Sequence, residues 1–267
     1  MPTSIPPITA LIVIDGLRPD ALEKANCPNL SVLRAEGATS LQARSVMPSI
    51  TLPCHVSMFH SVPPERHGVT TNVWSPMARP LPGLTEIAHE ADLRNAFFYN
   101  WEPLRCLSRP DSLTLSYCYN DAEKDIVHGD PNIAREAARA ITSDHFDFVF
   151  VYFGTLDNVG HSEGWMSPQY LSHLEYVDGA LGTLRHALPA EAATLLTSDH
   201  GGHGRNHGTK KAEDLTVPWI LNGPGVRRGY ELENEVTLLD VAPTLAHILG
   251  LAPHSAWEGR CVTEAFE

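Results

Sequence analysis

The chain has 267 residues, of which 43% are hydrophobic and 19% are charged, and its formal net charge is −13 at pH 7. This composition is typical of a globular protein and excludes a disordered or collagen-like chain. The acidic balance argues against a protein that coats nucleic acid, because such a protein needs a basic face to neutralise phosphates. It also argues against electrostatic docking on anionic lipid. We therefore expect neither a nucleic-acid polymer nor a membrane as a partner.

The N-terminal segment and the cysteines bear on the cellular compartment. No stretch of the sequence approaches the ~18 consecutive apolar residues that a membrane-spanning helix needs. Segment 1–16 lacks a basic region and its apolar run ends at Asp15, so we interpret it as a core strand and not as a signal peptide. Five cysteines without a C-x-x-C pair predict neither a disulfide framework nor a thiolate zinc site. These features favour a cytoplasmic protein.

Five apolar runs of strand length punctuate the chain. Their nearly continuous hydrophobicity is expected of strands that are buried on both faces of a parallel sheet. The predicted strands are residues 8–14, 95–99, 147–153, 193–197 and 217–221.

Helical patterns lie between and after these strands. Asp130-Pro131 is typical of an N-cap followed by an N1 proline, and it predicts a helix up to Ile141. Ser167-Pro168 starts a longer amphipathic pattern that continues to Leu184. Residues 239–249 form a third such pattern, closed by Gly250. The alternation predicts a three-layer α/β/α sandwich around a largely parallel sheet, in one domain over 1–267.

Acidic residues and histidines follow three of the predicted strands. Asp15 follows the first strand, Asp157 and His161 follow the strand 147–153, and Asp199-His200 follows the strand 193–197. In open parallel sheets, ligands bind beyond the carboxyl ends of the strands. We therefore expect these side chains at one edge of the sheet.

This set of side chains predicts a site for two metal ions. Aspartate and histidine suit zinc, and manganese or iron is possible. Asp157 and His161 point the same way if their segment makes a helical turn. Adjacent Asp199 and His200 would diverge, so each could face a different side of a metal pair. Any one of these motifs alone is more often an ordinary turn, but a protein without a bound cation has little reason to crowd carboxylates and imidazoles on one edge.

At this point the sequence resembles the alkaline phosphatase superfamily, and most of all its nucleotide pyrophosphatase/phosphodiesterase branch. The order and spacing of the matching motifs cover nearly the whole chain, so the resemblance implies an alkaline phosphatase-like fold. The motifs are VIDGLRPD at 13–20, PSITLPCH at 48–55, ERHGVTTNVW at 65–74, LDNVGHSEG at 156–164 and TSDHGGHG at 197–204, and TLLDVAPTLAHILG at 237–250 resembles the late helix of sulfatases and their relatives.

The resemblance implies a role for each matching residue. Thr51 would be the nucleophile and would pass through a phospho-threonine intermediate, and Asn72 would hydrogen-bond a phosphoryl oxygen. A metal ion would lower the pKa of the Thr51 hydroxyl, so no side-chain base is required. Thr51 is also interpretable as a helix N-cap before Pro53. One metal would be surrounded by Asp15, Thr51, Asp199 and His200, and the other by Asp157, His161 and a further histidine.

The identity of the further histidine stays open between two positions. His207 precedes Val217-Pro218-Trp219 as in compact members of the superfamily, and we favour it. His203 is the second candidate and could instead contact substrate. Sulfatases use a modified cysteine as nucleophile, but that position is Thr51 here, and Cys54 lacks their C-x-P-x-R pattern, so we discount sulfatase activity.

The sequence says less about the substrate. Diesterase relatives hold a nucleotide base between an aromatic after the nucleophile and a tyrosine; Tyr152 matches the tyrosine, but Leu52 departs from the aromatic. Monoesterases add a cation for the second phosphate charge, for which Arg18 and Arg205 are candidates. We expect a hydrolase of small-molecule phosphodiesters or nucleotide pyrophosphates. A phosphomonoesterase or phosphonate hydrolase on the same site and a non-catalytic metal-binding protein are the alternatives.

Overall fold

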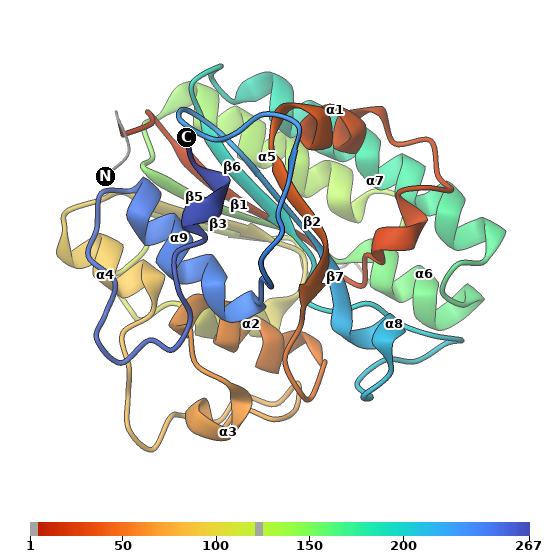
Figure 1. The fold of residues 1–267 in the computed structure, drawn as a ribbon, viewed down its shortest axis with the longest axis horizontal. Coiled ribbons are helices and arrows are strands. Elements are labelled where there is room, and N and C mark those ends of the chain that lie inside the picture. Colours follow the sequence, from red (N-terminus) through yellow and green to blue (C-terminus); the bar gives the residue numbers. More distant parts are fainter. Residues whose placement is uncertain (1–4, 121–124) are drawn as a thin grey trace.

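A computed structural model describes residues 5–120 and 125–267 of the chain. Eight strands in these residues form one sheet with the order β4-β3-β5-β1-β6-β7-β2-β8 (Figure 1). The strands are β1 (Thr9–Ile14), β2 (Ala38–Arg44), β3 (Asn95–Tyr99), β4 (Leu115–Cys118), β5 (Phe148–Phe153), β6 (Ala193–Thr197), β7 (Thr216–Asn222) and β8 (Tyr230–Glu231).

The centre of the sheet is parallel. Strand β1 pairs in parallel with β5 on one side and with β6 on the other, so that Val13 lies opposite both Tyr152 and Thr197. Strand β7 runs antiparallel to both β6 and β2. The prediction of a largely parallel sheet is therefore confirmed, with β7 as the strand that reverses.

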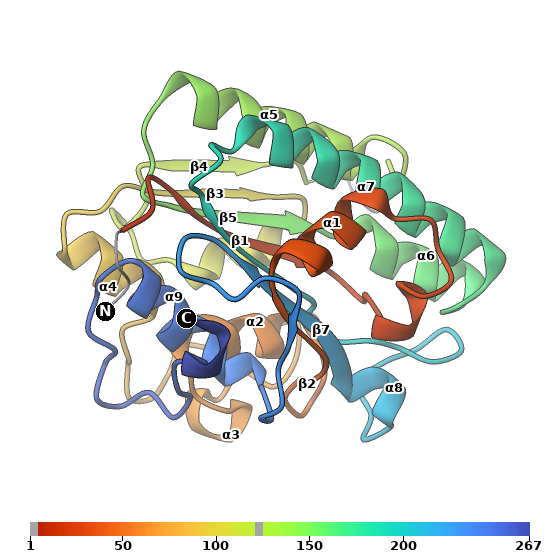
Figure 2. The same ribbon diagram turned by 45° about the horizontal axis from the view of Figure 1, so that its top comes forward.

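Helices cover both faces of the sheet (Figure 2). Helices α1, α5 and α7 lie on one face, and α2, α4 and α9 lie on the other, while α6 and α8 lie near one end of the sheet (Figure 2). The helices are α1 (Pro28–Glu36), α2 (Thr51–His60), α3 (Pro64–His67), α4 (Leu84–Glu90), α5 (Gly129–Ser143), α6 (Thr155–Glu163), α7 (Pro168–Ala187), α8 (Ala212–Leu215) and α9 (Val241–Ile248).

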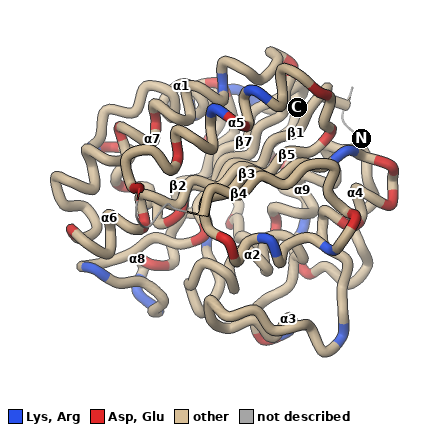
Figure 3. The backbone as a smooth tube through the Cα atoms, turned by 180° about the vertical axis from the view of Figure 1, so that it is seen from behind, with Lys and Arg blue, Asp and Glu red and all other residues tan. Residues whose placement is uncertain are grey.

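Each face of the sheet has its own hydrophobic core. Strand β5 supplies both, because its side chains alternate between the two faces. Phe150 packs in the core with Phe59 of α2, whereas Phe153 packs in the core with Tyr170 of α7. This arrangement confirms the predicted three-layer α/β/α sandwich. Among the strands only β2 and β8 contain a charged residue, and the other charged residues of the described chain lie along helices and loops (Figure 3).

The boundaries of the predicted elements shift by a few residues. All five predicted strands form, and β3 and β6 have the predicted bounds. The third predicted helix splits into a 3-10 turn over Leu238–Asp240 followed by α9. Helix α5 begins at Gly129, so Asp130 is inside the helix and is not its N-cap. Strands β2, β4 and β8 were not predicted; β2 has a mixed burial pattern and β8 has only two residues.

Two other expectations concern the cysteines and membrane-spanning helices. All five cysteines are free, as expected from their spacing. Within residues 5–120 and 125–267, no helix is both long and apolar enough to cross a bilayer. The single domain over 1–267 stays a prediction, although every strand of the described chain joins the same sheet.

Candidate metal centre

The carboxyl ends of three neighbouring strands bring three aspartates together. Asp15 follows β1, Asp199 follows β6, and Asp157 lies in α6, which begins just after β5. Because β5, β1 and β6 are adjacent and parallel, the segments after them emerge at one edge of the sheet. Asp15 and Asp199 are buried, with 2% and 0% of their surface exposed. The expected convergence of the strand ends is present.

His200 lies between two of these carboxylates. Its Nε2 atom is 3.3 Å from Asp15 Oδ1 and 3.4 Å from Asp199 Oδ2. The expectation that Asp199 and His200 would diverge is therefore wrong. The backbone bends at Asp199, and the Nδ1–H of His200 bonds the carbonyl of Gly201, so that its Nε2 faces the Asp199 carboxylate.

A second group of ligand-type atoms forms around α6. Oxygen and nitrogen atoms of Asp157, His161 and His207 lie within 4.8 Å of one another, and the same holds for Asp15, Asp157 and His200. Asp157 and His161 share one face of a helical turn, as expected from their spacing, with His161 Nε2 3.4 Å from Asp157 Oδ2. Asp157 thus belongs to both groups.

The three histidines share one hydrogen-bonding arrangement. The Nδ1–H of His161 donates to the carbonyl of Arg205, that of His200 to Gly201, and that of His207 to Ser49, at 2.9, 2.8 and 2.8 Å. These bonds fix the tautomer, so each Nε2 presents a lone pair. In all three residues the Nε2 atom is the one that faces an aspartate.

The electrostatics of the cluster call for a cation. Asp15 Oδ1, Asp157 Oδ1 and Asp199 Oδ2 are buried and have no hydrogen-bond partner in the described residues. Burial, followed by repulsion from a neighbouring aspartate, raises the pKa of all three carboxyls, that of Asp199 to about 7. Carboxylate oxygens that face imidazole lone pairs repel one another unless a cation lies between them. The residues present therefore fit divalent metal ions.

Thr51 is the first residue of α2 and lies beside this cluster. Its Oγ1 atom is 3.3 Å from His200 Nε2. The N-cap position is taken by Ile50, so the interpretation of Thr51 as the N-cap is wrong by one residue. The Leu52 N–H, near the start of the same helix, donates to Asn72 Oδ1 at 3.0 Å. That bond orients the Asn72 amide, so its Nδ2 is left as the donor.

A cavity of about 190 Å³ opens onto these residues. It is lined by Asp15, Thr51, Asn72, Trp101, Tyr152, Gly154, Asp157, Asn158, His161 and His207. Trp101 and Asn158 are additions that sequence reasoning missed. A signal for Trp101 was available, because Asn100-Trp101 follows the predicted strand 95–99 in the way that Asp15 follows the first strand. Asn158 is next to Asp157, but its position beside a predicted metal ligand did not by itself predict that it lines the cavity.

The remaining sequence candidates occupy different surroundings. Tyr152 donates its hydroxyl to Asp15 Oδ2 and is 2% exposed, so its polar end is engaged by a carboxylate. His203 bonds Asp214 at 2.6 Å and is in neither ligand group. Arg18 bonds Asp20 and the carbonyl of Gly202. Arg205 contacts the cluster only through its backbone carbonyl, which accepts the hydrogen bond from His161.

Trp165 packs the loops of the site against one another and was also missed. Its Nε1–H donates to the carbonyl of Gly16 at 2.9 Å. A β-carbon at Gly160 or Gly202 would lie 2.7 Å or 2.2 Å from the indole, so both positions require glycine. The ring also contacts His161 edge-on at 5.0 Å. An apolar ring at this position fixes segments from three parts of the sequence.

Two family models match separate parts of the chain. The model of type I phosphodiesterase/nucleotide pyrophosphatase matches residues 9–104. The model of the metalloenzyme superfamily matches residues 124–253. The first match contains Asp15, Thr51 and Asn72, and the second contains the other residues of the ligand groups.

Curated relatives match parts of much longer proteins. A 2,3-bisphosphoglycerate-independent phosphoglycerate mutase from Syntrophotalea carbinolica is 30% identical over 140 residues, which are 50% of this chain and 26% of that protein. Human ectonucleotide pyrophosphatase/phosphodiesterase family member 7 is 25% identical over 221 residues, 72% of this chain and 47% of that protein. The chain thus spans about a quarter to a half of the length of these relatives.

Solved structures match almost the whole fold. Murine ectonucleotide pyrophosphatase/phosphodiesterase 5, an inactive variant in complex with AMP, has a TM-score of 0.80 at 17% identity, over 97% of this chain and 100% of that one. A phosphonate monoester hydrolase of Agrobacterium radiobacter has a TM-score of 0.78 at 16% identity, over 98% and 77%. The two family models thus match the chain to type I phosphodiesterase/nucleotide pyrophosphatase in its N-terminal part and to the metalloenzyme superfamily in its C-terminal part, and the solved structures share its alkaline phosphatase-like fold.

Proposed function

We propose that this protein is a two-metal-dependent hydrolase of phosphoric esters with Thr51 as its nucleophile. The observation that carries the proposal is the orientation of three imidazole lone pairs toward the carboxyl groups of Asp15, Asp157 and Asp199. The Nε2 atoms of His200 and His207 face buried oxygens that have no other partner, that of His161 faces Asp157 Oδ2, and the Thr51 hydroxyl lies beside His200. Such an arrangement is costly without cations and well suited to holding them.

The ligand groups suggest how two ions would be held. Asp157, His161 and His207 would hold one of them; Asp15, Asp199, His200 and the Thr51 hydroxyl would hold the other. Zinc fits this set of oxygen and nitrogen atoms best, and manganese or iron would also be accepted. Such ions, when bound, lower the pKa of a hydroxyl and stabilise charge on phosphoryl and leaving-group oxygens.

The residues around the cavity would supply the nucleophile and a hydrogen-bond donor to the phosphoryl group. The Thr51 oxygen would form a bond to phosphorus as the bond to the leaving oxygen breaks, and water would then hydrolyse the phospho-threonine ester. Thr51 lies at the N-terminus of α2, where the helix dipole favours negative charge. Asn72 would donate its Nδ2–H to a phosphoryl oxygen. The murine neighbour is described as inactivated by a threonine-to-alanine change, which supports a threonine nucleophile.

The lining of the cavity favours a diester over a monoester. Among the described residues that line it there is no lysine or arginine. A phosphomonoester carries a second negative charge that enzymes usually meet with such a cation, whereas a phosphodiester carries one charge. Trp101 and Asn158 offer a ring and an amide for the ester group that leaves. We therefore propose phosphodiester or nucleotide pyrophosphate substrates.

Hydrolysis of phosphomonoesters or phosphonate monoesters is the second candidate. It would use the same nucleophile and ions, and the phosphonate monoester hydrolase with the same fold favours it. A metal-binding protein without turnover is the third possibility. It would have no use for a threonine and an asparagine at the mouth of the metal cluster.

A paired assay tests the proposal. The zinc-loaded and the manganese-loaded protein would be given bis-p-nitrophenyl phosphate and p-nitrophenyl phosphate, with and without a chelator. We expect faster cleavage of the diester, loss of cleavage with the chelator, and loss of activity in Thr51→Ala. Thr51→Ser is the matched control, because it keeps the hydroxyl. Cleavage of neither ester, or full activity in Thr51→Ala, would overturn the catalytic proposal, and a preference for the monoester would overturn the diester preference.

A further inference from the structure

The helix that carries Asp157 and His161 is capped by residues from other elements. No side chain of its own segment caps α6, whose N-cap residue is Gly154. Instead, the Gly154 N–H donates to Asn100 Oδ1 at 3.0 Å. Asn100 directly follows β3 and is 2% exposed. The start of α6 is therefore fixed by a buried amide from a different part of the chain.

A buried carboxylate completes this cap. Asp130 of α5 accepts hydrogen bonds from Asn100 Nδ2 at 2.6 Å, from the Thr155 N–H at 3.4 Å and from the Thr155 hydroxyl. It has no exposed surface. Burial raises its pKa to about 6 although these donors act in the opposite direction. Such a costly carboxylate is stabilised here by the N-terminal end of a helix, where its charge is favourable.

His173 of α7 adds a third member. Its Nε2 atom lies 2.7 Å from Thr155 Oγ1. Since the Thr155 hydroxyl donates to Asp130, it accepts this bond, and His173 carries its proton on Nε2. Burial lowers the pKa of His173 to about 4, which keeps the ring neutral. The chain of bonds thus runs from α7 through the first residue of α6 to α5.

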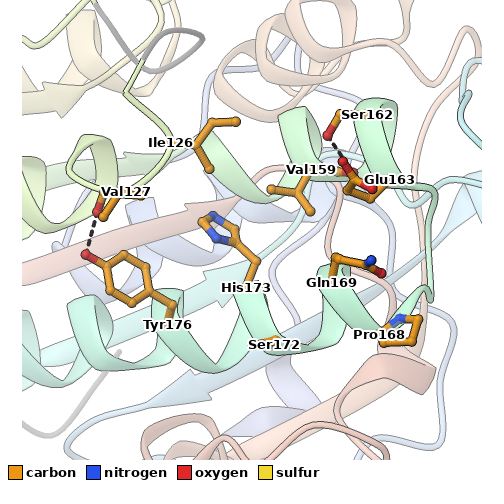
Figure 4. Close-up of a pocket in the computed structure, with 10 residues that line it drawn as sticks. All are labelled: Ile126, Val127, Val159, Ser162, Glu163, Pro168, Gln169, Ser172, His173 and Tyr176. Atoms are coloured by element: carbon orange, nitrogen blue, oxygen red, sulfur yellow. Dashed lines mark hydrogen bonds between the residues drawn. The ribbon is translucent and has the colours of Figure 1, made fainter.

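An open cavity of about 700 Å³ lies on the other side of His173. It is bounded by Val127, by Val159 and Glu163 of α6 and by His173 and Tyr176 of α7, and His173 projects between these two helices (Figure 4). None of its lining residues belongs to the ligand groups described above. The buried contact to Thr155 is therefore reachable from solvent through a space that is separate from the metal centre.

We propose that Asp130, Thr155 and His173 form a positioning network that holds the start of α6, and through it sets the metal affinity of the Asp157/His161/His207 group. The inference rests on the proposed function, because it concerns the metal ions of that same site. Two of the three ligands in this group lie in α6, at the third and seventh residues of the helix. A displaced helix start would move both of them relative to His207.

The positions of the other ligands should change much less. Asp15 and Asp199 follow β1 and β6, and His200 is next to Asp199. None of these residues makes a hydrogen bond to the network. Asp157 also lies within reach of Asp15 and His200, so the network predicts unequal effects, in which the ion of the Asp157/His161/His207 group is weakened more than the other ion.

The chain offers a matched control in Asp178. This carboxylate is 1% exposed and accepts hydrogen bonds from the Asn29 and Leu30 N–H groups at the start of α1. It is thus a second buried aspartate that caps a helix from another element. Helix α1 carries no residue of the metal centre. Asp178→Asn reports what general destabilisation does to metal binding.

The experiment measures zinc binding to the full chain by equilibrium dialysis against a zinc buffer, together with the thermal midpoint of each variant. Thr155→Val removes the hydroxyl at nearly constant volume, and Thr155→Ser keeps it. We expect Thr155→Val and Asp130→Asn to weaken one of the two zinc ions by about 10- to 100-fold, the range for groups that orient metal ligands. We expect Thr155→Ser and Asp178→Asn to bind both ions as the wild type does.

His173→Ala gives an independent arm of the test. It removes the donor to Thr155 and leaves an opening toward the cavity, so added imidazole should restore part of the zinc affinity in this variant. Imidazole should have no such effect on Thr155→Val, which lacks the acceptor. Restoration in both variants to the same extent would contradict the network.

The outcomes separate this inference from the proposed function. If the wild type binds no zinc, the proposed function fails. If the wild type binds two ions and Thr155→Val binds both with unchanged affinity, the positioning network is refuted while the proposed function stands. Equal losses in Thr155→Val and Asp178→Asn would also refute it, since the effect would then follow stability alone.

Discussion

The imidazole rings of His200 and His207 stack face to face, with 3.7 Å between their centroids and 12° between their planes. Their Nε2 atoms face different carboxylates, because His200 lies 3.3 Å from Asp15 Oδ1 and His207 lies 3.8 Å from Asp157 Oδ1. Burial and the neighbouring His200 lower the pKa of His207 to about 3, so its ring stays neutral. The stacked pair thus joins two ligand groups that would each hold a cation.

This relationship predicts the effect of removing one ring of the pair. His207→Ala should reduce the bound zinc from two ions to one, because the Asp157 group keeps only two ligands from the chain, fewer than the three to four that zinc sites use. Metal content after dialysis, measured by mass spectrometry, checks this result.

His203→Ala is the matched control for that variant. His203 lies in the same loop, but its ring bonds Asp214, and it belongs to neither ligand group. It should keep both ions. The opposite pattern, with one ion lost in His203→Ala and two kept in His207→Ala, would transfer the ligand role to His203.

Asn72→Ala should reduce the turnover rate without changing the metal content. Loss of one preorganised donor to a developing charge costs about 10²- to 10³-fold in kcat. The variant also leaves the Leu52 N–H at the start of α2 without its acceptor, which costs about 1 kcal/mol of stability. Steady-state kinetics on bis-p-nitrophenyl phosphate and zinc content measured on the same sample check the prediction. A rate within threefold of the wild type would show that Asn72 has no such role.

The buried carboxyl of Asp199 should lower the stability of the metal-free protein as the pH rises from about 4 to 7. Burial raises the pKa of Asp199 to about 7, far above that of an unfolded aspartate. Between these values the folded chain holds a proton that the unfolded chain has lost. The stabilisation from this group is therefore lost as the pH rises, by at most about 1.4 kcal/mol per pH unit. Buried histidines with lowered pKa values, among them His55, His60 and His207, contribute the opposite slope around pH 6.5, so the contribution of Asp199 is the difference between the wild type and Asp199→Asn.

Thermal unfolding of the chelator-treated wild type and of Asp199→Asn between about pH 5 and 7.5 measures this difference. The midpoint of the wild type relative to that of Asp199→Asn should fall with rising pH, because the variant lacks the titrating carboxyl. The zinc-loaded protein should show a weaker dependence, since a bound cation replaces the proton. A difference between the two midpoints that stays constant over this range would contradict the raised pKa of Asp199.

The sequence predicted the parts of this molecule whose pattern is local. The runs 95–99 and 193–197 became strands with the predicted bounds, because continuous apolar sequence between turns allows few alternatives. Strand β2 could not be predicted, because its residues alternate irregularly and it is formed by pairing with β7. The residues after the strand ends converged because parallel strands leave no other place for them.

At the site, the sequence did not predict the directions in which side chains point. The divergence expected for the adjacent Asp199 and His200 is not found, because the backbone bends at Asp199 and the Nδ1–H of His200 bonds the carbonyl of Gly201, so that its Nε2 faces the Asp199 carboxylate. The cap of α6 is formed by Asn100 and Asp130, which are far from this helix in sequence. No local sequence motif could therefore predict it.

Tyr152→Phe distinguishes two roles for a residue that the sequence assigned to substrate. The Tyr152 hydroxyl donates to Asp15 Oδ2, while Asp15 Oδ1 faces His200. Without this donor a buried carboxylate oxygen loses its partner, which costs about 1–3 kcal/mol. The ion held by Asp15 should then bind about tenfold more weakly, while KM for bis-p-nitrophenyl phosphate at saturating zinc stays unchanged, because the ring keeps its place.

Trp101→Leu should give the reverse pattern. Trp101 lines the cavity but belongs to neither ligand group, so its loss should raise KM and leave zinc binding intact. Zinc titration and steady-state kinetics on both variants separate the two roles. If Tyr152→Phe raised KM at unchanged zinc affinity, Tyr152 would contact substrate and its bond to Asp15 would be secondary. If it weakened zinc alone, the tyrosine would act on the substrate only through the carboxylate that it orients.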